Sequence, residues 1–337
     1  MKRANFLKEG STIGLIAPSF GANIEPYKTR LDYSINYFKK LGFNIKIFGD
    51  IYGYYKGASE SKELRAKHFV DAYLDKEVTV IWSVGGGELM MEILPLINFE
   101  IIGKATPKLF IGYSDNTNLT FTLTTLLNIY SVYGPTFTAF GMEKMDSFLL
   151  NTIEIIKGNI TKQHSSLYHE PRNLIETEPL ASYTLTEQTK WLNLTGEKDL
   201  RLKGRIIGGC LDVLVNLVGT SFDNVKNFSN QFIEDSLIFY LETFAYTPFS
   251  LKLALLQLKE AGWFNNVSGI LFGRHLNNEP ILDISHNEVI LDVLSDLKIP
   301  IIVDLDIGHV KPMMTIINGS LVEVVNSEYD SYLEIII

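Results

Sequence analysis

Short apolar runs alternate with segments of helical spacing along the first 130 residues of the chain. The apolar runs predict buried strands at Thr12–Ser19, Phe43–Phe48, Val78–Val84 and Leu109–Ile111. Apolar residues three or four apart predict helices at Tyr27–Leu41, Lys62–Leu74, Met90–Ile97 and Leu119–Leu127. Strands alternating with helices in this way are typical of a parallel sheet with helices on both faces. The N-terminal part is therefore predicted to be an α/β domain.

The pattern weakens over residues 148–204, which are polar and mixed, and we expect a crossover or linker with some strands there. From Lys203 onward a second domain is predicted. Its strands are expected at Ser236–Leu241, Val267–Phe272, Ile301–Asp304 and in a C-terminal pair, with helices near Ser250–Gly262 and Glu288–Leu297. A chain of 337 residues exceeds one ordinary core. The predicted organisation is an α/β domain over residues 1–150, a crossover over 151–200 and a C-terminal domain over 201–337.

Composition and charge narrow the classes of partner. The net charge of −9 argues against a nucleic-acid partner and against an anionic membrane surface. No apolar stretch reaches the roughly 18 residues of a membrane span. The basic residues near the N-terminus lack the apolar core of a signal peptide. Because Cys210 is the single cysteine, an internal disulfide is excluded, and we expect a cytoplasmic protein.

The first candidate for chemistry is Ser114, which lies where a predicted strand turns into a predicted helix. The strand Leu109–Ile111 stops at Gly112, and the helical pattern begins shortly after Ser114. A serine at such a corner projects its hydroxyl outward, next to the unpaired amides of a helix start. The sequence matches the nucleophile-elbow motif G-x-S-x-G in part, because its fifth position is Asn116. The alternative is a serine that only caps the helix.

A run of three glycines, Gly85 to Gly87, follows the neighbouring predicted strand. In parallel sheets the loops that bind ligands lie at the carboxyl ends of the strands, so this run and Ser114 are expected at the same edge. Glycine allows the backbone to approach closely, so an amide of this run could face an oxyanion. A phosphate-binding loop is not indicated, since the G-x-G-x-x-G spacing is missing. No metal-ligand spacing is present either.

A nucleophilic serine needs a base, and the base needs a group that orients it. Among the six histidines, we expect His68, His164, His169, His275 and His286 at the surface. His309 follows a predicted strand, between Gly308 and Pro312, in what we interpret as a fixed loop. Glu242 directly follows the apolar strand, where a carboxylate is costly unless it is paired. The alternatives are a plain loop histidine and a glutamate that marks where the strand reaches water.

Seven short blocks, spread over nearly the whole chain and in this order, resemble the LD-carboxypeptidase family of serine peptidases. They are Ile13–Ser19, Ser83–Gly86, Ile111–Thr117, Tyr133–Pro135, Ile207–Leu211, Leu241–Thr243 and Asp306–His309 with Pro312. The resemblance implies a parallel α/β domain followed by a smaller, mostly β C-terminal domain. It also implies a homodimer that needs no cofactor.

The resemblance assigns a role to each candidate. It implies Ser114 as the nucleophile, His309 as the base and Glu242 as the carboxylate that orients the base. The backbone amides of Gly86 (or its neighbour Gly85) and Asp115 would form the oxyanion hole. Activity on an amide next to a free carboxylate is the expected function.

The blocks lean toward the microcin C immunity branch of the family. Val84 precedes the glycines where murein-recycling enzymes carry arginine, and Asp-Asn-Thr follows Ser114. The expected substrate is therefore a peptidyl- or aminoacyl-nucleotide, with the L,D bond of a muropeptide as the alternative. A third possibility is a non-catalytic binding protein.

Four features bear on substrate recognition. Cys210 stands where the family has asparagine, and the segment 244–248 lacks the expected acidic residues. Gly85 and Cys210 are candidate substrate contacts. Trp191 is another, because its ring could stack on a substrate base, although a buried structural tryptophan is the more common case.

Overall fold

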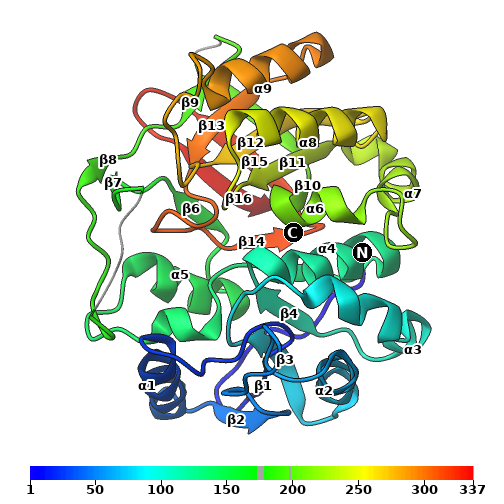
Figure 1. Ribbon diagram of the computed structural model, residues 1–337, viewed down its shortest axis with the longest axis vertical. Helices are drawn as coiled ribbons and strands as arrows, with labels where there is room; N and C mark the ends of the chain where they lie inside the picture. Colours follow the sequence, from blue (N-terminus) through cyan, green and yellow to red (C-terminus); the bar gives the residue numbers. More distant parts are fainter. Residues whose placement is uncertain (173–177, 197–198, 337) are drawn as a thin grey trace. The chain divides into compact units, whose positions relative to one another are not determined.

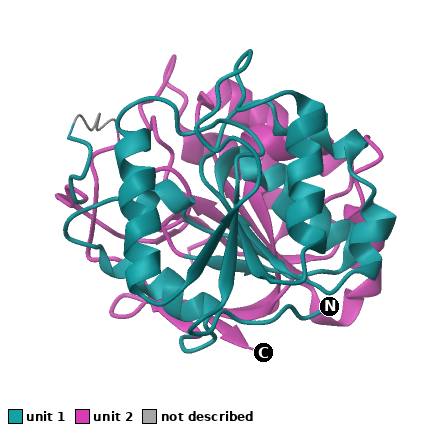
Figure 2. Cartoon of the chain, turned by 90° about the horizontal axis from the view of Figure 1, so that it is seen from below, with its two compact units in different colours: residues 1–160, 175–182, 315–318 teal, residues 161–174, 183–314, 319–337 magenta. Residues whose placement is uncertain are grey.

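The computed structural model describes residues 1–172, 178–196 and 199–336, which form two compact units (Figure 2). Unit 1 consists of residues 1–160, 175–182 and 315–318. Unit 2 consists of residues 161–174, 183–314 and 319–337. Unit 1 therefore includes a segment from near the C-terminus of the chain.

Unit 1 is built on a six-stranded sheet with the order β14-β5-β4-β3-β1-β2. The strands are β1 (Thr12–Ile16), β2 (Asn44–Ile47), β3 (Val78–Ser83), β4 (Leu109–Gly112), β5 (Ser131–Tyr133) and β14 (Ile316–Asn318). Strands β1 to β5 are parallel, and β14 pairs antiparallel with β5 at the edge. The parallel α/β architecture predicted from the sequence is confirmed.

Helices cover both faces of this sheet (Figures 1 and 2). The helices of unit 1 are α1 (Tyr27–Lys40), α2 (Lys62–Leu74), η1 (Met90–Leu96), α3 (Phe99–Lys104), η2 (Ser114–Asn116), α4 (Thr117–Leu127), η3 (Phe137–Phe140) and α5 (Ser147–Ile156). Phe38 of α1 packs against Trp82, with ring centroids 5.4 Å apart. Phe69 of α2 packs against Phe110, at 5.9 Å. Trp82 is in register with Ile111, the residue next to Phe110, so the two helices pack on opposite faces.

Two local expectations in this unit need correction. The helix expected at Met90–Ile97 is present, but it is a 3₁₀ helix over Met90–Leu96, with Pro95 inside it. Proline lacks the amide that an α-helical hydrogen bond would need there. Helix α5 lies across residue 150, where the sequence predicted the start of a crossover. Asp146 caps this helix by accepting a hydrogen bond from the amide of Phe148 at 2.8 Å.

Unit 2 is built on an eight-stranded sheet with the order β6-β16-β15-β10-β11-β12-β13-β9. The strands are β6 (Lys162–His164), β9 (Leu192–Asn193), β10 (Leu200–Cys210), β11 (Leu237–Glu242), β12 (Val267–Gly273), β13 (Ile301–Leu305), β15 (Leu321–Asn326) and β16 (Tyr332–Ile336). The short pair β7 (Tyr168–His169) and β8 (Glu187–Gln188) is separate. Strands β10 to β13 are parallel and the outer pairings are antiparallel.

The parallel core of this sheet places four strand ends at one edge. Cys210, Glu242, Gly273 and Leu305 end β10, β11, β12 and β13 in that order. The helices of unit 2 are α6 (Leu211–Leu217), α7 (Val225–Gln231), η4 (Ile233–Asp235), α8 (Pro248–Glu260), α9 (His286–Leu294) and η5 (Ser295–Leu297). Helices α8 and α9 run side by side (Figure 1). Throughout residues 1–172, 178–196 and 199–336, no helix combines the length and the apolar character needed to cross a bilayer.

Candidate active site

Ser114 lies at the corner between β4 and η2, in a strained backbone conformation. Its φ of +62° is in the left-handed region, which costs a non-glycine residue about 1–2 kcal/mol. Its amide donates a hydrogen bond of 3.3 Å to the hydroxyl of Tyr133. The N-cap residues of η2 and α4 are Tyr113 and Asn116, so Ser114 does not occupy the N-cap position of either helix. The backbone strain is instead typical of a serine held in place for chemistry.

Asn116 holds this corner together. Its Nδ2 donates hydrogen bonds to the carbonyl oxygens of Gly85 and Tyr113, both at 2.9 Å. Gly112 makes room for it, because a Cβ at Gly112 would lie 2.6 Å from Asn116 Cγ. The asparagine that departs from the G-x-S-x-G motif therefore ties the serine corner to the glycine run after β3.

The glycine run after β3 lies directly against Ser114. A Cβ at Gly86 would lie 3.3 Å from Ser114 Cβ and 3.5 Å from Ser114 Oγ. Gly87 has a φ of +149°, and a Cβ there would lie 2.1 Å from the hydroxyl of Ser19. Phe20 donates from its amide to the carbonyl of Gly86 at 3.0 Å. A side chain at Gly86 would press on Ser114, and a side chain at Gly87 would clash with Ser19.

The side chain of Asp115 is buried and anchors the same region. Its Oδ2 accepts hydrogen bonds from the Ser19 hydroxyl at 2.5 Å and from the Met90 amide at 2.9 Å. Its Oδ1 accepts one from Asn118 Nδ2 at 2.9 Å. Burial raises the pKa of the Asp115 carboxyl, and the hydrogen bonds from Ser19 and Met90 oppose the shift. The carboxyl links the loop after β1, the start of η1 and the start of α4.

Glu242 and His309 form a pair within unit 2. Glu242 is the last residue of β11 and is 0% exposed, so the expectation that it marks where the strand reaches water is wrong. His309 lies beyond β13, and its Nδ1 is 2.8 Å from Glu242 Oε2. When Nδ1 carries the proton that faces the carboxylate, Nε2 is the basic nitrogen. The pair has the geometry of an oriented general base.

Two glycines and one phenylalanine shape the surroundings of this pair. A Cβ at Gly308, which has a φ of +95°, would lie 2.5 Å from Glu242 Oε2. A Cβ at Gly273 would lie 2.2 Å from the carbonyl of Ile307. The ring of Phe244 lies against the His309 imidazole, with centroids 4.8 Å apart. The loop that carries His309 is thus pressed closely onto Glu242.

The other two candidate substrate contacts in unit 2 are both buried. Cys210 is in register with Glu242 on the neighbouring strand, and burial raises the pKa of its thiol well above the usual range. Trp191 is 5% exposed, and its indole Nε1 donates to Asp306 Oδ2 at 2.9 Å. The indole N–H is therefore already hydrogen-bonded to another residue of unit 2. Substrate contact by either residue stays a prediction.

Three of the five histidines expected at the surface are buried instead. His169, His275 and His286 are 8%, 3% and 1% exposed. His275 and His286 stack, with ring centroids 4.4 Å apart. His275 Nδ1 lies 2.8 Å from the hydroxyl of Thr243, and His286 Nε2 lies 3.0 Å from the carbonyl of Tyr246. Both histidines therefore pack against the segment that follows Glu242.

Sequence reasoning assigned no role to Arg274 or Asp306, although Asp306 lies in one of the family blocks. The two residues form a buried ion pair. A signal was present, because each charged residue comes directly after an apolar strand, as Glu242 does. Sequence reasoning assigned no role to Gly273 and used Gly308 only as a sign of a fixed loop, because the need for close approach depends on Glu242.

The chain is similar to known proteins over nearly its whole length. Residues 13–134 match the LD-carboxypeptidase N-terminal domain, and residues 203–324 match the LD-carboxypeptidase C-terminal domain. The Microcin C7 self-immunity protein MccF of Escherichia coli is 27% identical over 340 residues, covering 92% of this chain and 89% of MccF. The "Probable murein peptide carboxypeptidase" of Bacillus subtilis (strain 168) is 25% identical over 334 residues, covering 97% and 93%.

Solved structures agree with the fold. The MccF-like protein from Bacillus anthracis str. Ames has a TM-score of 0.85 at 23% identity, covering 100% of this chain and 99% of that one. The MccF-like protein from Streptococcus pneumoniae, solved in complex with AMP, has a TM-score of 0.79 at 25% identity, covering 97% and 99%. The two matched domains together span more than half of the chain. The chain therefore belongs to the LD-carboxypeptidase family and is a serine-type carboxypeptidase.

Proposed function

We propose that Ser114, His309 and Glu242 form the catalytic triad of this carboxypeptidase. The observation that carries the proposal is the 2.8 Å contact between His309 Nδ1 and the fully buried Glu242 carboxylate. A carboxylate in that position holds the imidazole in one tautomer and stabilises the imidazolium that forms during catalysis. The strained backbone of Ser114 and the close approach of Gly86 support the assignment of the nucleophile.

The proposed reaction is the hydrolysis of an amide bond next to a free carboxylate. The Ser114 oxygen attacks the amide carbonyl while its proton passes to His309 Nε2. The negative oxygen that results is stabilised by the backbone amides of Gly86 and Asp115. His309 then gives its proton to the departing amine, and the C–N bond breaks to leave an ester on Ser114. Water, deprotonated by His309, hydrolyses this ester and restores the serine.

The proposed substrate is a peptidyl- or aminoacyl-nucleotide. Two similarities support it: the relative from Escherichia coli is a microcin C7 self-immunity protein, and the related Streptococcus structure holds AMP. The muropeptide alternative is supported by the similar "Probable murein peptide carboxypeptidase" of Bacillus subtilis. Cys210 stands where the family has asparagine, so a candidate substrate contact differs from the family pattern. A direct test with both substrates decides between the two classes. A cytoplasmic homodimer remains part of the proposal.

Substitution of the nucleophile and of the orienting acid tests the triad. We expect Ser114→Ala to abolish turnover without changing the circular dichroism spectrum. Ser147→Ala, at an exposed serine of α5, is the matched control and should keep wild-type turnover. Glu242→Gln should lower kcat by about 10³- to 10⁴-fold with little change in KM, since the base loses its orienting charge. Full activity in folded Ser114→Ala would refute the mechanism and favour a non-catalytic binding protein.

A further inference from the structure

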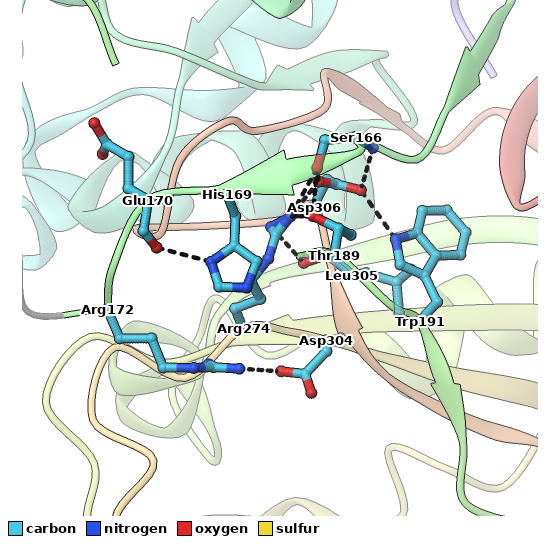
Figure 3. Close-up of polar contacts among 10 residues, drawn as sticks. All are labelled: Ser166, His169, Glu170, Arg172, Thr189, Trp191, Arg274, Asp304, Leu305 and Asp306. Carbon is cyan, nitrogen blue, oxygen red and sulfur yellow. Dashed lines mark hydrogen bonds and ion pairs between the residues drawn. The ribbon is translucent and has the colours of Figure 1, made fainter. Parts of the chain in front are cut away.

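The loop that carries His309 begins with a buried carboxylate that has four hydrogen-bond donors. Asp306 is 0% exposed, and Figure 3 shows Ser166, Trp191 and Arg274 around its carboxylate. Its Oδ2 accepts from Trp191 Nε1 at 2.9 Å and from the Ser166 amide at 3.2 Å. Its Oδ1 accepts from the Ser166 hydroxyl and from Arg274 Nη2. A buried carboxylate with this many donors is held in one position, because each donor would otherwise lose a bond in the interior.

Arg274 ties this carboxylate to the end of the neighbouring strand. It directly follows Gly273, the last residue of β12, and its side chain is fully buried. Its Nη2 also reaches the hydroxyls of Ser166 at 3.2 Å and Thr189 at 3.4 Å. The backbone amide of Arg274 donates to the carbonyl of Leu305 at 3.3 Å. The ends of β12 and β13 are thus joined by backbone and side chain together.

The backbone around Asp306 is fixed on both sides. The Ile307 amide donates to the Leu305 carbonyl at 2.8 Å, and the Met314 amide donates to the Asp306 carbonyl at 2.7 Å. Three residues after Asp306 comes His309, with Gly308 packed against the Glu242 carboxylate in between. A shift of the backbone at Asp306 would therefore change the contact between His309 Nδ1 and Glu242.

We propose that Asp306 is a positioning residue of this enzyme, held by Arg274 and Trp191, and that it sets the place of His309 against Glu242. In this account Trp191 supports catalysis through its indole N–H and Asp306, rather than by stacking on substrate. The inference rests on the proposed role of His309 as the base.

Asp304, an acidic residue near the end of β13, provides a matched control. Asp304 also pairs with an arginine, since Arg172 Nη2 lies 2.6 Å from its Oδ1 (Figure 3). Unlike Asp306, the side chain of Asp304 is 29% exposed. The left-handed φ of Asp304, +62°, is one that asparagine also tolerates. Asp304→Asn and Asp306→Asn are thus the same chemical change, two residues apart. Only Asp306→Asn alters the carboxylate that Arg274 and Trp191 hold.

The test compares kcat, KM and the pH dependence of kcat in wild type, Asp306→Asn and Asp304→Asn, using an aspartyl-adenylate-type amide and a muropeptide tetrapeptide. We expect Asp306→Asn to lower kcat by about tenfold or more, to leave KM within about twofold and to move the acid limb of the pH profile. Asp304→Asn should match wild type in all three. A purely structural Asp306 would lower the unfolding temperature while leaving kcat per folded molecule and the pH profile unchanged, and that result would overturn the inference.

Trp191→Phe provides an independent test should Asp306→Asn fail to fold. It keeps an aromatic ring but removes the indole N–H that Asp306 accepts, together with part of the ring volume. The inference predicts a lower kcat at unchanged KM, whereas a raised KM at wild-type kcat would instead make Trp191 a substrate contact and overturn it. His309→Gln separates this inference from the function on which it rests. An active His309→Gln variant would refute the role of His309 as the base. An inactive His309→Gln variant together with a fully active Asp306→Asn variant would refute only the positioning role of Asp306.

Discussion

Glu242 and His309 are 67 residues apart in the sequence, yet their side chains meet at 2.8 Å because Gly308 carries no side chain. A Cβ at position 308 would overlap the space of the Glu242 carboxylate, at 2.5 Å from Oε2. The left-handed φ of +95° also favours glycine there. The contact between the proposed base and its orienting acid thus depends on a residue that takes no part in the chemistry.

Gly308→Ala should therefore damage catalysis more than it damages the fold. The new methyl group would push the His309 loop off Glu242, and we expect a loss of about 100-fold in kcat, as for a misplacement of roughly 1 Å. Gly219→Ala is the control, since Gly219 has a φ of +74° but nothing within 4 Å of its Cβ position. Steady-state kinetics and thermal unfolding of both variants provide the measurement. Equal kcat in the two variants would mean that the close approach at Gly308 does not matter.

Gly86→Ala tests the close approach of the glycine run to Ser114. Its methyl group would lie 3.3 Å from Ser114 Cβ, which is a tight contact, so either the loop or the serine must move. We expect kcat to fall by about 10- to 100-fold. Gly85→Ala should have a smaller effect, because a Cβ there meets only the Phe20 carbonyl, at an ordinary 3.7 Å. The ratio of the two kcat values is the measurement, and a larger loss in Gly85→Ala would contradict the assignment of Gly86.

The buried histidines should make stability depend on pH. Burial lowers the pKa of His275 to about 3, with the stacked His286 and nearby Arg172 adding to the effect. Between pH 6 and pH 4 the unfolded chain binds a proton at this histidine that the folded chain does not bind. Stability should therefore fall with falling pH, by up to about 1.4 kcal/mol per pH unit for this group. The pKa values of His169 and His286 are also lowered by burial and act in the same direction.

Urea unfolding at several pH values measures this dependence. His275→Gln should remove the contribution of this one histidine to the dependence of stability on pH. His164→Gln, at an exposed histidine beside Asp330, is the matched control for His275→Gln. A wild-type pH dependence in folded His275→Gln would show that His275 does not account for it.

Much of unit 1 could be predicted because its signals are local. The apolar run before Gly112 and the polar cluster after it mark the corner at Ser114 without any knowledge of the rest of the chain. The observed strand β4 and helix α4 follow those signals. Strand β14 gives no such signal, because its pairing with β5 joins segments more than 180 residues apart. Helix α5 was missed because the residues after it are polar and mixed, which hid the end of the apolar face.

The candidate site could be predicted from the sequence only in part, for a different reason. Glu242 and His309 could be proposed singly, since each follows a strand, but their pairing depends on the order of β11, β12 and β13 in the sheet. Arg274 and Asp306 each follow an apolar run, but charged residues are mostly exposed, and the sequence does not show which two of them pair in the interior. The same reason explains why His275 and His286 were expected at the surface. Fold class follows from local patterns, whereas the polar interior depends on contacts between distant segments.

Paired hydrolysis by one preparation tests the central claim most directly. Wild type and Ser114→Ala would each be offered an aspartyl-adenylate-type amide and a muropeptide tetrapeptide, with the products resolved by mass spectrometry. The account predicts that wild type cleaves the nucleotide amide and that Ser114→Ala cleaves neither substrate. Release of D-alanine from the tetrapeptide alone would contradict the proposed substrate class, and turnover of either substrate by Ser114→Ala at the wild-type rate would contradict the mechanism.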